Sequence, residues 1–294
     1  MLTLIVGIAC SDGIVLASDS AATFAMEGMP TIGQQQVTKI QTLSEVVLYA
    51  STGAVGISQL IANSLKTRWD KKEFSGIGTP EEMMHKIGVG ICELVRPYLE
   101  SANLTRSLNK DPSPSLCKCI VGIPVKKKPC LLTFDYNGAP EAVSAELPFV
   151  SMGCAQGIAD PFLALLRRLL WQPGSTSPPT IAEGRLVAAW TIEHARLTNP
   201  GGVGGPIQLS TLSADGVAKS GNEDIQEHLA RIHSAEKALV EQLRPTTEGP
   251  QAPAPPSLLA ECGPVKGYPS PLSVCLALLV PMKPCVIRAQ ERGD

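Results

Sequence analysis

The sequence predicts an α+β fold. Apolar runs and amphipathic stretches follow one another as four strands, two helices, three strands, two helices, two strands and one helix. Asp12-Gly13 and Asp215-Gly216 mark hairpins, because Gly adopts a positive φ at no steric cost. Runs of strands that alternate with pairs of helices are compatible with helix layers on both sides of two stacked sheets.

The N-terminal stretch is the most strongly patterned part of the chain. Residues 4–10 and 14–19 are short apolar runs on either side of Ser11-Asp12-Gly13. Runs this apolar and rich in β-branched residues are typical of strands that are buried on both faces. Chain termini usually lie at the surface, so a buried first strand indicates that the first residues have a function.

The later elements are predicted from periodicity and from helix-end signals. Thr79 followed by Pro80, and Thr180 followed by Glu183, are typical helix starts. In the helix expected at residues 160–170, the apolar residues predict an inward face made of Phe162, Leu163, Leu166, Leu169 and Leu170. The other expected elements cover residues 34–40, 46–51, 53–72, 79–95, 116–123, 130–138, 149–154, 180–197, 207–212 and 220–243.

The composition changes at Pro245. Residues 245–271 are rich in Pro, Gly, Ala and Thr, a composition that does not form a packed core. The sequence therefore predicts two parts: a folded domain at residues 1–244, and a Pro-rich linker and C-terminal tail at residues 245–294.

Charge and hydropathy narrow the class of protein. The chain has 294 residues, 44% of them hydrophobic, and a net charge of −2, so we expect neither nucleic acid nor a membrane as a partner. The sequence contains no run of eighteen apolar residues, so we expect no transmembrane helix. The N-terminus lacks a basic segment, so we expect no signal peptide. Nine cysteines without a Cys-x-x-Cys pair are typical of a reducing compartment, and we expect a cytoplasmic protein.

No cofactor or metal site is predicted. His228 and His233 are five residues apart, which is not the spacing of a helical metal pair. Cys154 stands at a predicted strand-to-helix turn, where a thiol nucleophile is conceivable. A small buried residue at a tight turn is the interpretation that we favour there.

The N-terminal motif resembles that of a known family. The similarity is to the opening of proteasome β-type subunits, which are N-terminal nucleophile hydrolases. It is carried by Thr3 to Ile8, then by Asp12-Gly13-Ile14-Val15-Leu16-Ala17-Ser18-Asp19-Ser20 and by Ala22-Thr23. The resemblance is specific in residues 3–23 and extends in element order to residue 243. It implies a four-layer αββα sandwich of two stacked antiparallel sheets flanked by helices.

The resemblance also implies site residues. Thr3 matches the nucleophile, Asp19 the acidic residue that orients a cation, and Gly53 the glycine whose N–H stabilises the oxyanion. In this family the nucleophile is the hydroxyl of an N-terminal threonine. Its free α-amine, with a pKa of roughly 7.7–8.0, can accept the hydroxyl proton.

The family also carries a lysine roughly thirty residues after the threonine, and here the sequence departs from the pattern. Simple registers place Gln34, Gln35 or Gln36 there, and we assign Gln36 to this position. Glutamine carries neither a charge nor a titratable proton. Lys39 lies three positions after Gln36, and strand alternation predicts that it points to the opposite face.

Three further positions differ from the family. Val203 stands where the family has a serine, Asn199 or Pro200 where it has an aspartate, and Cys154 where it has a second serine. Leu2 after Met1 is too bulky for simple methionine removal, and no Gly precedes Thr3 for self-cleavage.

Three hypotheses follow. In the first, the chain is a catalytically degenerate, ring-forming homo-oligomeric subunit with weak or no peptidase activity. In the second, it is an active threonine-type endopeptidase that acts on peptides or unfolded proteins through Thr3 after removal of Met1 and Leu2. In the third, it is a non-enzymatic soluble binding scaffold.

Overall fold

The chain folds as alternating groups of strands and helices. The structure is a computed structural model, and it describes residues 3–26, 29–107, 116–144, 146–171, 177–199 and 201–244. Within these ranges the strands are β1 (Leu4–Cys10), β2 (Gly13–Ser18), β3 (Ala21–Met26), β4 (Met29–Gln36), β5 (Ile40–Ser44), β6 (Val47–Gly53), β7 (Cys117–Val125), β8 (Lys128–Phe134), β9 (Pro140–Ala142), β10 (Phe149–Gly153), β11 (Gln208–Ser213) and β12 (Gly216–Lys219). The helices are α1 (Val55–Asp70), α2 (Pro80–Ser107), α3 (Gln156–Leu170), α4 (Ile181–Thr198) and α5 (Asn222–Leu243).

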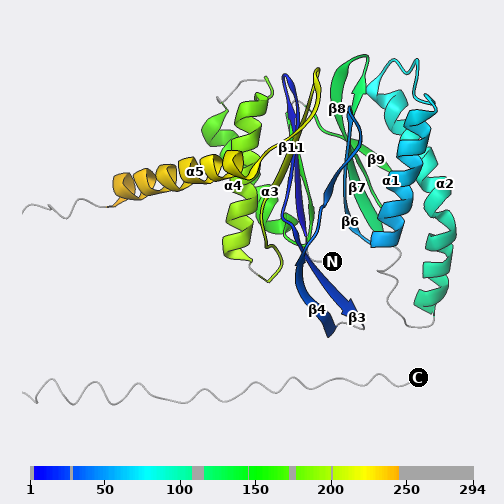
Figure 1. The fold of residues 1–294 in the computed structure, drawn as a ribbon, viewed down its shortest axis with the longest axis horizontal. Helices are drawn as coiled ribbons and strands as arrows, with labels where there is room; N and C mark the ends of the chain where they lie inside the picture. Colours follow the sequence, from blue (N-terminus) through cyan, green and yellow to red (C-terminus); the bar gives the residue numbers. More distant parts are fainter. Residues whose placement is uncertain are drawn as a thin grey trace, which may run out of the picture. The chain divides into compact units, whose positions relative to one another are not determined.

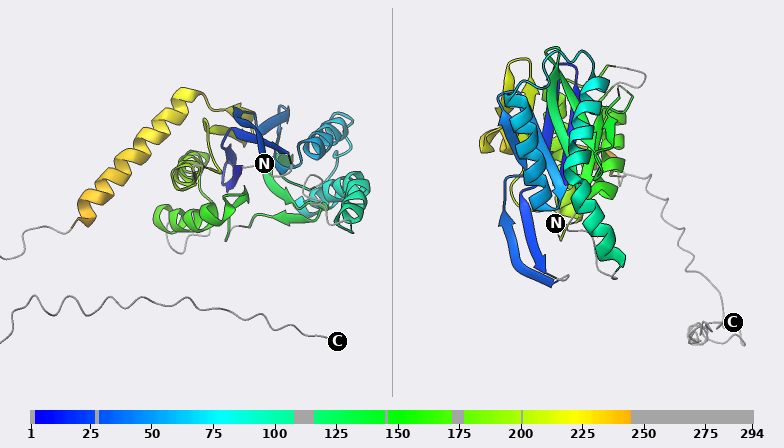
Figure 2. Two further views of the ribbon diagram at one scale, coloured as in Figure 1. Left: turned by 90° about the horizontal axis from the view of Figure 1, so that it is seen from below. Right: turned by 90° about the vertical axis from the view of Figure 1, so that its right-hand side faces the viewer.

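Two antiparallel sheets stack between two layers of helices. The first sheet has the order β10-β1-β2-β11-β12, and the second has the order β5-β6-β7-β8-β9. Figure 1 shows α3, α4 and α5 on the outer side of the first sheet and α1 and α2 on the outer side of the second. The views of Figure 2 show the same layers from two other directions. The predicted α+β class and αββα sandwich are therefore confirmed.

Three apolar clusters fill the spaces between the four layers. Leu4 and Val6 of β1 pack with α3, α4 and α5. Ile5 of the same strand belongs to the cluster between the sheets, and a third cluster packs α1 and α2 on the second sheet. Because successive side chains of β1 point into different clusters, this strand is buried on both faces, as its sequence predicts.

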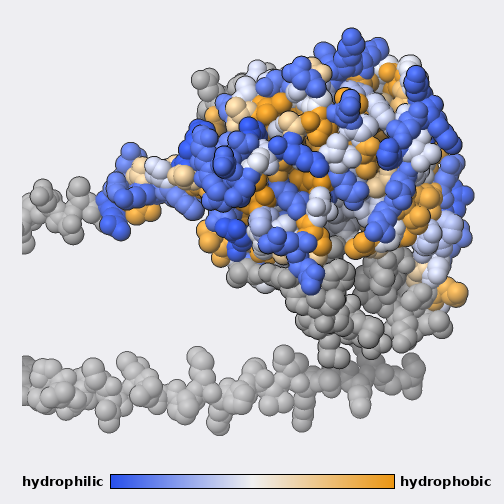
Figure 3. Space-filling model, in the orientation of Figure 1, coloured by the Kyte–Doolittle hydropathy of each residue, from blue (hydrophilic) through white to orange (hydrophobic). Residues whose placement is uncertain are grey.

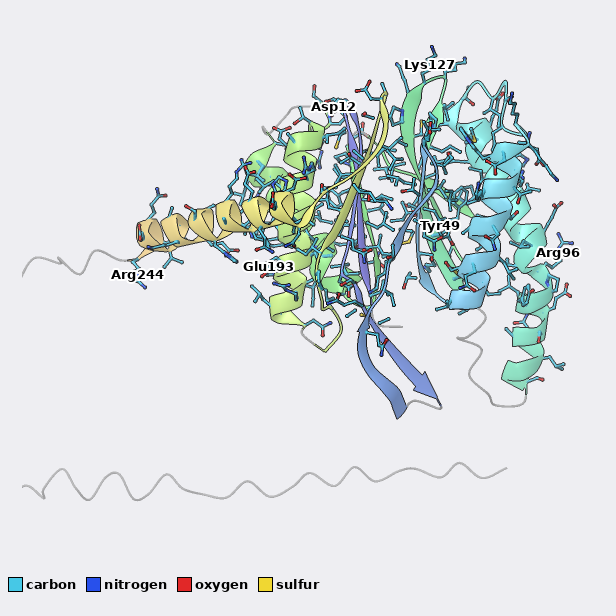
Figure 4. The ribbon with its side chains drawn as sticks, viewed as in Figure 1. Asp12, Tyr49, Arg96, Lys127, Glu193 and Arg244 are labelled. Atoms are coloured by element: carbon cyan, nitrogen blue, oxygen red, sulfur yellow. The ribbon has the colours of Figure 1, made fainter. Side chains whose placement is uncertain are left out.

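Local signals place the helices against the sheets. Thr180 and Glu183 form a reciprocal capping box at the start of α4, and Thr79 Oγ1 accepts a hydrogen bond from Glu82 N at the start of α2. Tyr49 of β6, labelled in Figure 4, donates its hydroxyl to the Ser58 carbonyl oxygen of α1 at 3.2 Å. Both predicted helix starts are confirmed.

Two expectations about elements are wrong. Residues 34–40 are not one strand, because β4 ends at Gln36 and β5 begins at Ile40, with residues 37–39 outside any strand. Leu169 and Leu170 do not face the core, since their side chains are 62% and 42% exposed. Leu163 and Leu166 are buried as predicted, so only the last turn of α3 leaves the packed face.

The compact unit that the structure describes ends near Leu243. The predicted tail, residues 245–294, lies outside the described residues, so the division into a domain and a tail stays a prediction. Among the described residues, no helix is long and apolar enough to cross a membrane.

Candidate functional site

Thr3 lies at the entrance to β1 and is 1% exposed. Its carbonyl oxygen accepts the backbone N–H of Cys154 at 3.0 Å, and its own N–H points at the Cys154 sulfur at 3.4 Å. Leu4 pairs with Gly153 across β1 and β10, which fixes this geometry. Thr3 is thus held between the first strand and the β10–α3 turn. This end of the sandwich lies opposite the turns that carry Asp12 and Lys127 (Figure 4).

Asp19 follows β2 and is fully buried. Its Oδ1 accepts the N–H of Leu4 at 2.9 Å, and its Oδ2 accepts the N–H of Gly204 at 3.2 Å. The carboxylate therefore joins the residue after Thr3 to the loop before β11. This anchoring agrees with the orienting role that the resemblance implies for Asp19.

Lys39 completes a buried ion pair with Asp19. Lys39 Nζ lies 2.7 Å from Asp19 Oδ1, and the lysine is 7% exposed. Gln36, at the end of β4, is exposed to solvent. The expectation that Lys39 points away from the site is wrong, and so is the inference that a glutamine takes the place of the cation beside Asp19.

The physical reason for this error is the break between β4 and β5. Strand alternation holds only within a continuous strand, and residues 37–39 belong to neither strand. One sequence signal could have identified the residue: Lys39 is the sole lysine between Asp19 and Lys66. If the β3–β4 hairpin is taken to be longer than usual in the family, Lys39 is the one lysine in this range that can match the family's lysine.

Burial lowers the pKa of Lys39 from its ordinary value, while the hydrogen bond that Lys39 donates to Asp19 and the negative charges of Asp19 and Cys154 oppose this effect. A lysine in this setting is more easily deprotonated than an exposed one. Lys39 lies at the start of β1, since the same Asp19 oxygen that it contacts also accepts the N–H of Leu4.

Gly53 lies at the end of β6, opposite Cys117 of β7. Its φ is +110°, and a Cβ at this position would collide with the Leu116 carbonyl oxygen. Only Gly fits such a backbone without strain. Its role as an oxyanion donor stays a prediction from the resemblance.

Three buried hydroxyl groups near Asp19 have no hydrogen-bond partner among the described residues. They belong to Thr3, Ser18 and Ser20. Ile5 pairs with Ser18, and continuing this register by two residues places Thr3 opposite Ser20. Buried polar groups are normally hydrogen-bonded, so this face has capacity for water or a substrate.

A groove of about 950 Å³ lies elsewhere, between α1 and α2. Two of the charged side chains in its lining, those of Arg68 and Glu73, form an ion pair with an Nε–Oε2 distance of 3.0 Å. In the described part of the chain, no group of three or more His, Cys, Asp or Glu side chains has the geometry to hold a metal ion. The buried cluster around Thr3 is therefore the site that we consider.

The fold and this site define the class of protein. An αββα sandwich whose first strand begins at a buried threonine, beside a Lys–Asp ion pair, is the arrangement that the resemblance to proteasome β-type subunits implies. The chain belongs to the proteasome subunit family: the family model described as "Proteasome subunit" matches residues 3–168, more than half of the sequence.

Solved structures agree on the fold. The chain is similar to Anbu (ancestral beta-subunit) from Yersinia bercovieri, with a TM-score of 0.60 and 15% identity over 84% of this chain and 100% of that one. It is also similar to an Anbu (Gly-1) mutant from Hyphomicrobium sp. strain MC1, with a TM-score of 0.57 and 15% identity over 83% and 100% of the two chains. No curated protein sequence matches this chain.

Proposed function

We propose that this protein is a threonine-type peptidase subunit that uses Thr3 as its nucleophile. The observation that supports the proposal is the buried ion pair between Lys39 and Asp19, 2.7 Å apart, beside the start of β1. The hypothesis of a degenerate site rests on an expected absence of the lysine, on the differences at residues 154, 199–200 and 203, and on the two residues before Thr3. With Lys39 in place, the active alternative is better supported.

In the proposed mechanism, the Thr3 hydroxyl attacks the carbonyl carbon of a peptide bond. A base must accept the hydroxyl proton, and a backbone N–H must stabilise the oxyanion that forms. Gly53 N–H is our candidate for the oxyanion donor. Lys39, paired with Asp19 beside the start of β1, keeps the site electropositive.

The α-amine of Thr3 becomes a base only when no residue precedes it. In the printed sequence Met1 and Leu2 come before Thr3, so the proposal includes their removal. A free amine has a pKa of roughly 7.7–8.0 and is partly neutral near pH 7. The Cys154 sulfur, 3.4 Å from Thr3 N, would then contact this amine.

The test is turnover of short fluorogenic peptides, combined with the intact mass of the purified protein. We expect wild type to hydrolyse peptides and to lack residues 1–2, and we expect Thr3→Ala and Lys39→Met to be inactive. Gln36→Lys is the control, because residue 36 is exposed and an added lysine there should change nothing. Activity that survives Thr3→Ala would overturn the nucleophile assignment.

The degenerate subunit remains the second candidate, and a specific observation favours it. Cys154 accepts and donates hydrogen bonds at the position where the resemblance implies a serine, and its sulfur contacts the Gly202 carbonyl oxygen at 3.4 Å. If this substitution abolishes catalysis, wild type will bind peptides without cleaving them. If the protein is instead a non-enzymatic binding scaffold, Thr3 has no special role, and we expect Thr3→Ala and wild type to bind peptides with equal affinity.

We also propose that the protein assembles with further copies of itself into a ring, the assembly that its resemblance to proteasome subunits implies. The apolar stripe of α5 supports this assembly. Ile225, Leu229 and Ile232 are buried on the body of the domain. Leu239, seven residues after Ile232, and Leu243 continue the same face but are 52% and 72% exposed. Figure 1 shows this end of α5 extending beyond α4, and Figure 3 shows hydrophobic residues on it.

Sedimentation velocity tests the assembly. We expect wild type to sediment as a multiple of the 31.0 kDa chain, and Leu239→Asp to shift the distribution towards the monomer. Leu104→Asp is the matched control, since Leu104 is 67% exposed on α2, in the opposite helix layer. A strictly monomeric wild type contradicts the proposal.

A further inference from the structure

One side chain holds the segment that carries Lys39. Gln208 is the first residue of β11, and its amide lies against residues 37–40. Its Oε1 accepts the N–H of Lys39 at 2.9 Å and that of Ile40 at 3.4 Å. Its Nε2 donates to the Val37 carbonyl oxygen at 2.5 Å. Only this orientation of the amide faces its oxygen to the two donors and its nitrogen to the acceptor.

The same residue is also fixed to the strand before Asp19. Gln208 pairs with Ser18, which immediately precedes Asp19. Its backbone therefore belongs to the first sheet, while its side chain accepts a hydrogen bond from Ile40, the first residue of β5 in the second sheet. Gln208 thus contacts both segments that carry the partners of the ion pair.

We propose that Gln208 is a positioning residue for the reaction, acting through Lys39. This inference rests on the proposed function. Residues 37–39 lie between β4 and β5, outside either strand, and the Val37 N–H donates to the Ser20 carbonyl oxygen at 2.8 Å. Gln208 adds three hydrogen bonds to this segment, accepting two and donating one, and they keep Lys39 Nζ within reach of Asp19. A supporting residue of this kind fixes the geometry of a reactive group without touching the substrate.

The kinetic test compares Gln208→Leu with Gln41→Leu. Gln41 is the matched control, since it lies on β5 after Ile40 and its side chain makes no hydrogen bond to residues 37–40. We expect Gln208→Leu to lower kcat by about 10- to 100-fold and to change KM by less than about 3-fold, as expected for a misplaced catalytic group. We expect Gln41→Leu to match wild type.

A second readout does not depend on activity. Lys39 is buried and should react slowly with acetic anhydride, which acylates neutral amines, and mass spectrometry can quantify the peptide that contains it. We expect Gln208→Leu to raise this rate by about 5-fold or more, by releasing the lysine towards solvent. Asp19 pairs with Lys39 and, like Cys154, raises its pKa, so the pH profile of acylation should also move when Lys39 is displaced.

The two readouts separate the possible failures. If wild type shows no peptidase activity, the proposed function fails, but the acylation rates still test Gln208. If Gln208→Leu matches wild type in acylation, the positioning role is overturned. Should Gln208→Leu not fold, Gln208→Glu keeps an acceptor for Lys39 N and loses the donor to Val37. We then expect an intermediate acylation rate, and a rate equal to wild type overturns the proposal.

Discussion

Lys39 and Asp19 form an ion pair with N–O separation 2.7 Å, and their side chains are 4% and 0% exposed. Asp19 also receives two backbone N–H groups, so its carboxylate has three donors. A buried pair of this kind is weak evidence for stability by itself, because removing two charges from water is costly. Its position beside Thr3 is a better reason for its presence, since a cation next to a nucleophile is chemically useful.

The ion pair predicts a strong coupling between its two residues. We expect Lys39→Met to lower the free energy of unfolding by about 3 kcal/mol, since it leaves the Asp19 charge buried without its cation. Lys39→Met with Asp19→Asn should cost less than the sum of the two single changes. Urea denaturation of the four proteins measures this coupling, and additive effects would show that the pair does not interact in solution.

Gly53→Ala is expected to damage the end of β6. The φ of Gly53 is +110°, and the new Cβ would meet the Leu116 carbonyl oxygen. We expect a loss of about 1–3 kcal/mol in the free energy of unfolding, and a loss of peptidase activity if the N–H of Gly53 moves. Gly56→Ala in α1 is the control, because a Cβ added at Gly56 would have no atom within 4 Å. We expect this change to be neutral or to stabilise the protein by about 0.5–1 kcal/mol. Equal effects of the two changes would contradict the strain argument.

Cys154 is expected to be the thiol whose modification stops the reaction. It is exposed and contacts Thr3, whereas burial raises the pKa of Cys10 to about 12 and of Cys117 to about 11. Iodoacetamide at pH 8 should therefore alkylate Cys154 before those two residues, and peptide turnover should fall with the same time course.

Cys154→Ser is the matched variant for this prediction. Serine keeps a hydrogen-bonding group beside Thr3 N, so we expect peptidase activity to persist and to resist iodoacetamide. Peptide mapping by mass spectrometry identifies the alkylated cysteines. Inhibition that proceeds unchanged in Cys154→Ser would assign the effect to another thiol.

His228 on α5 should make stability depend on pH. Burial lowers its pKa below the ordinary 6.5, helped by the charges of Arg185 and Arg231 and opposed by those of Glu227 and Asp224. Between the lowered value and 6.5, the unfolded chain binds more protons than the folded one, so stability is complete above pH 6.5 and decreases as the pH falls. Thermal unfolding between pH 7 and 5 measures this decrease.

His228→Gln should flatten the pH dependence of the unfolding temperature. His233→Gln is the control on the same helix, because the His233 side chain is exposed. An unchanged slope in His228→Gln would mean that other groups cause the acid sensitivity.

Much of the fold could be predicted from the sequence because its signals are local. The apolar runs around Asp12-Gly13 form β1 and β2, and the Thr180–Glu183 box begins α4. The surface position of Leu169 could not be predicted in this way, since periodicity does not show where the neighbouring layer ends. For the site, the motif at residues 3–23 was sufficient to place Thr3 and Asp19 together.

By itself, the sequence determined the family, the buried first strand and two of the residues at its entrance, because each is encoded in contiguous letters. Only the tertiary structure decided which residue supplies the cation. Lys39 reaches Asp19 because the chain leaves β4 at Gln36 and because Gln208, 169 residues away, holds the next segment in place. Hydrogen bonds between residues so distant in sequence leave no periodic pattern, and strand alternation assigns the wrong face wherever a strand is interrupted.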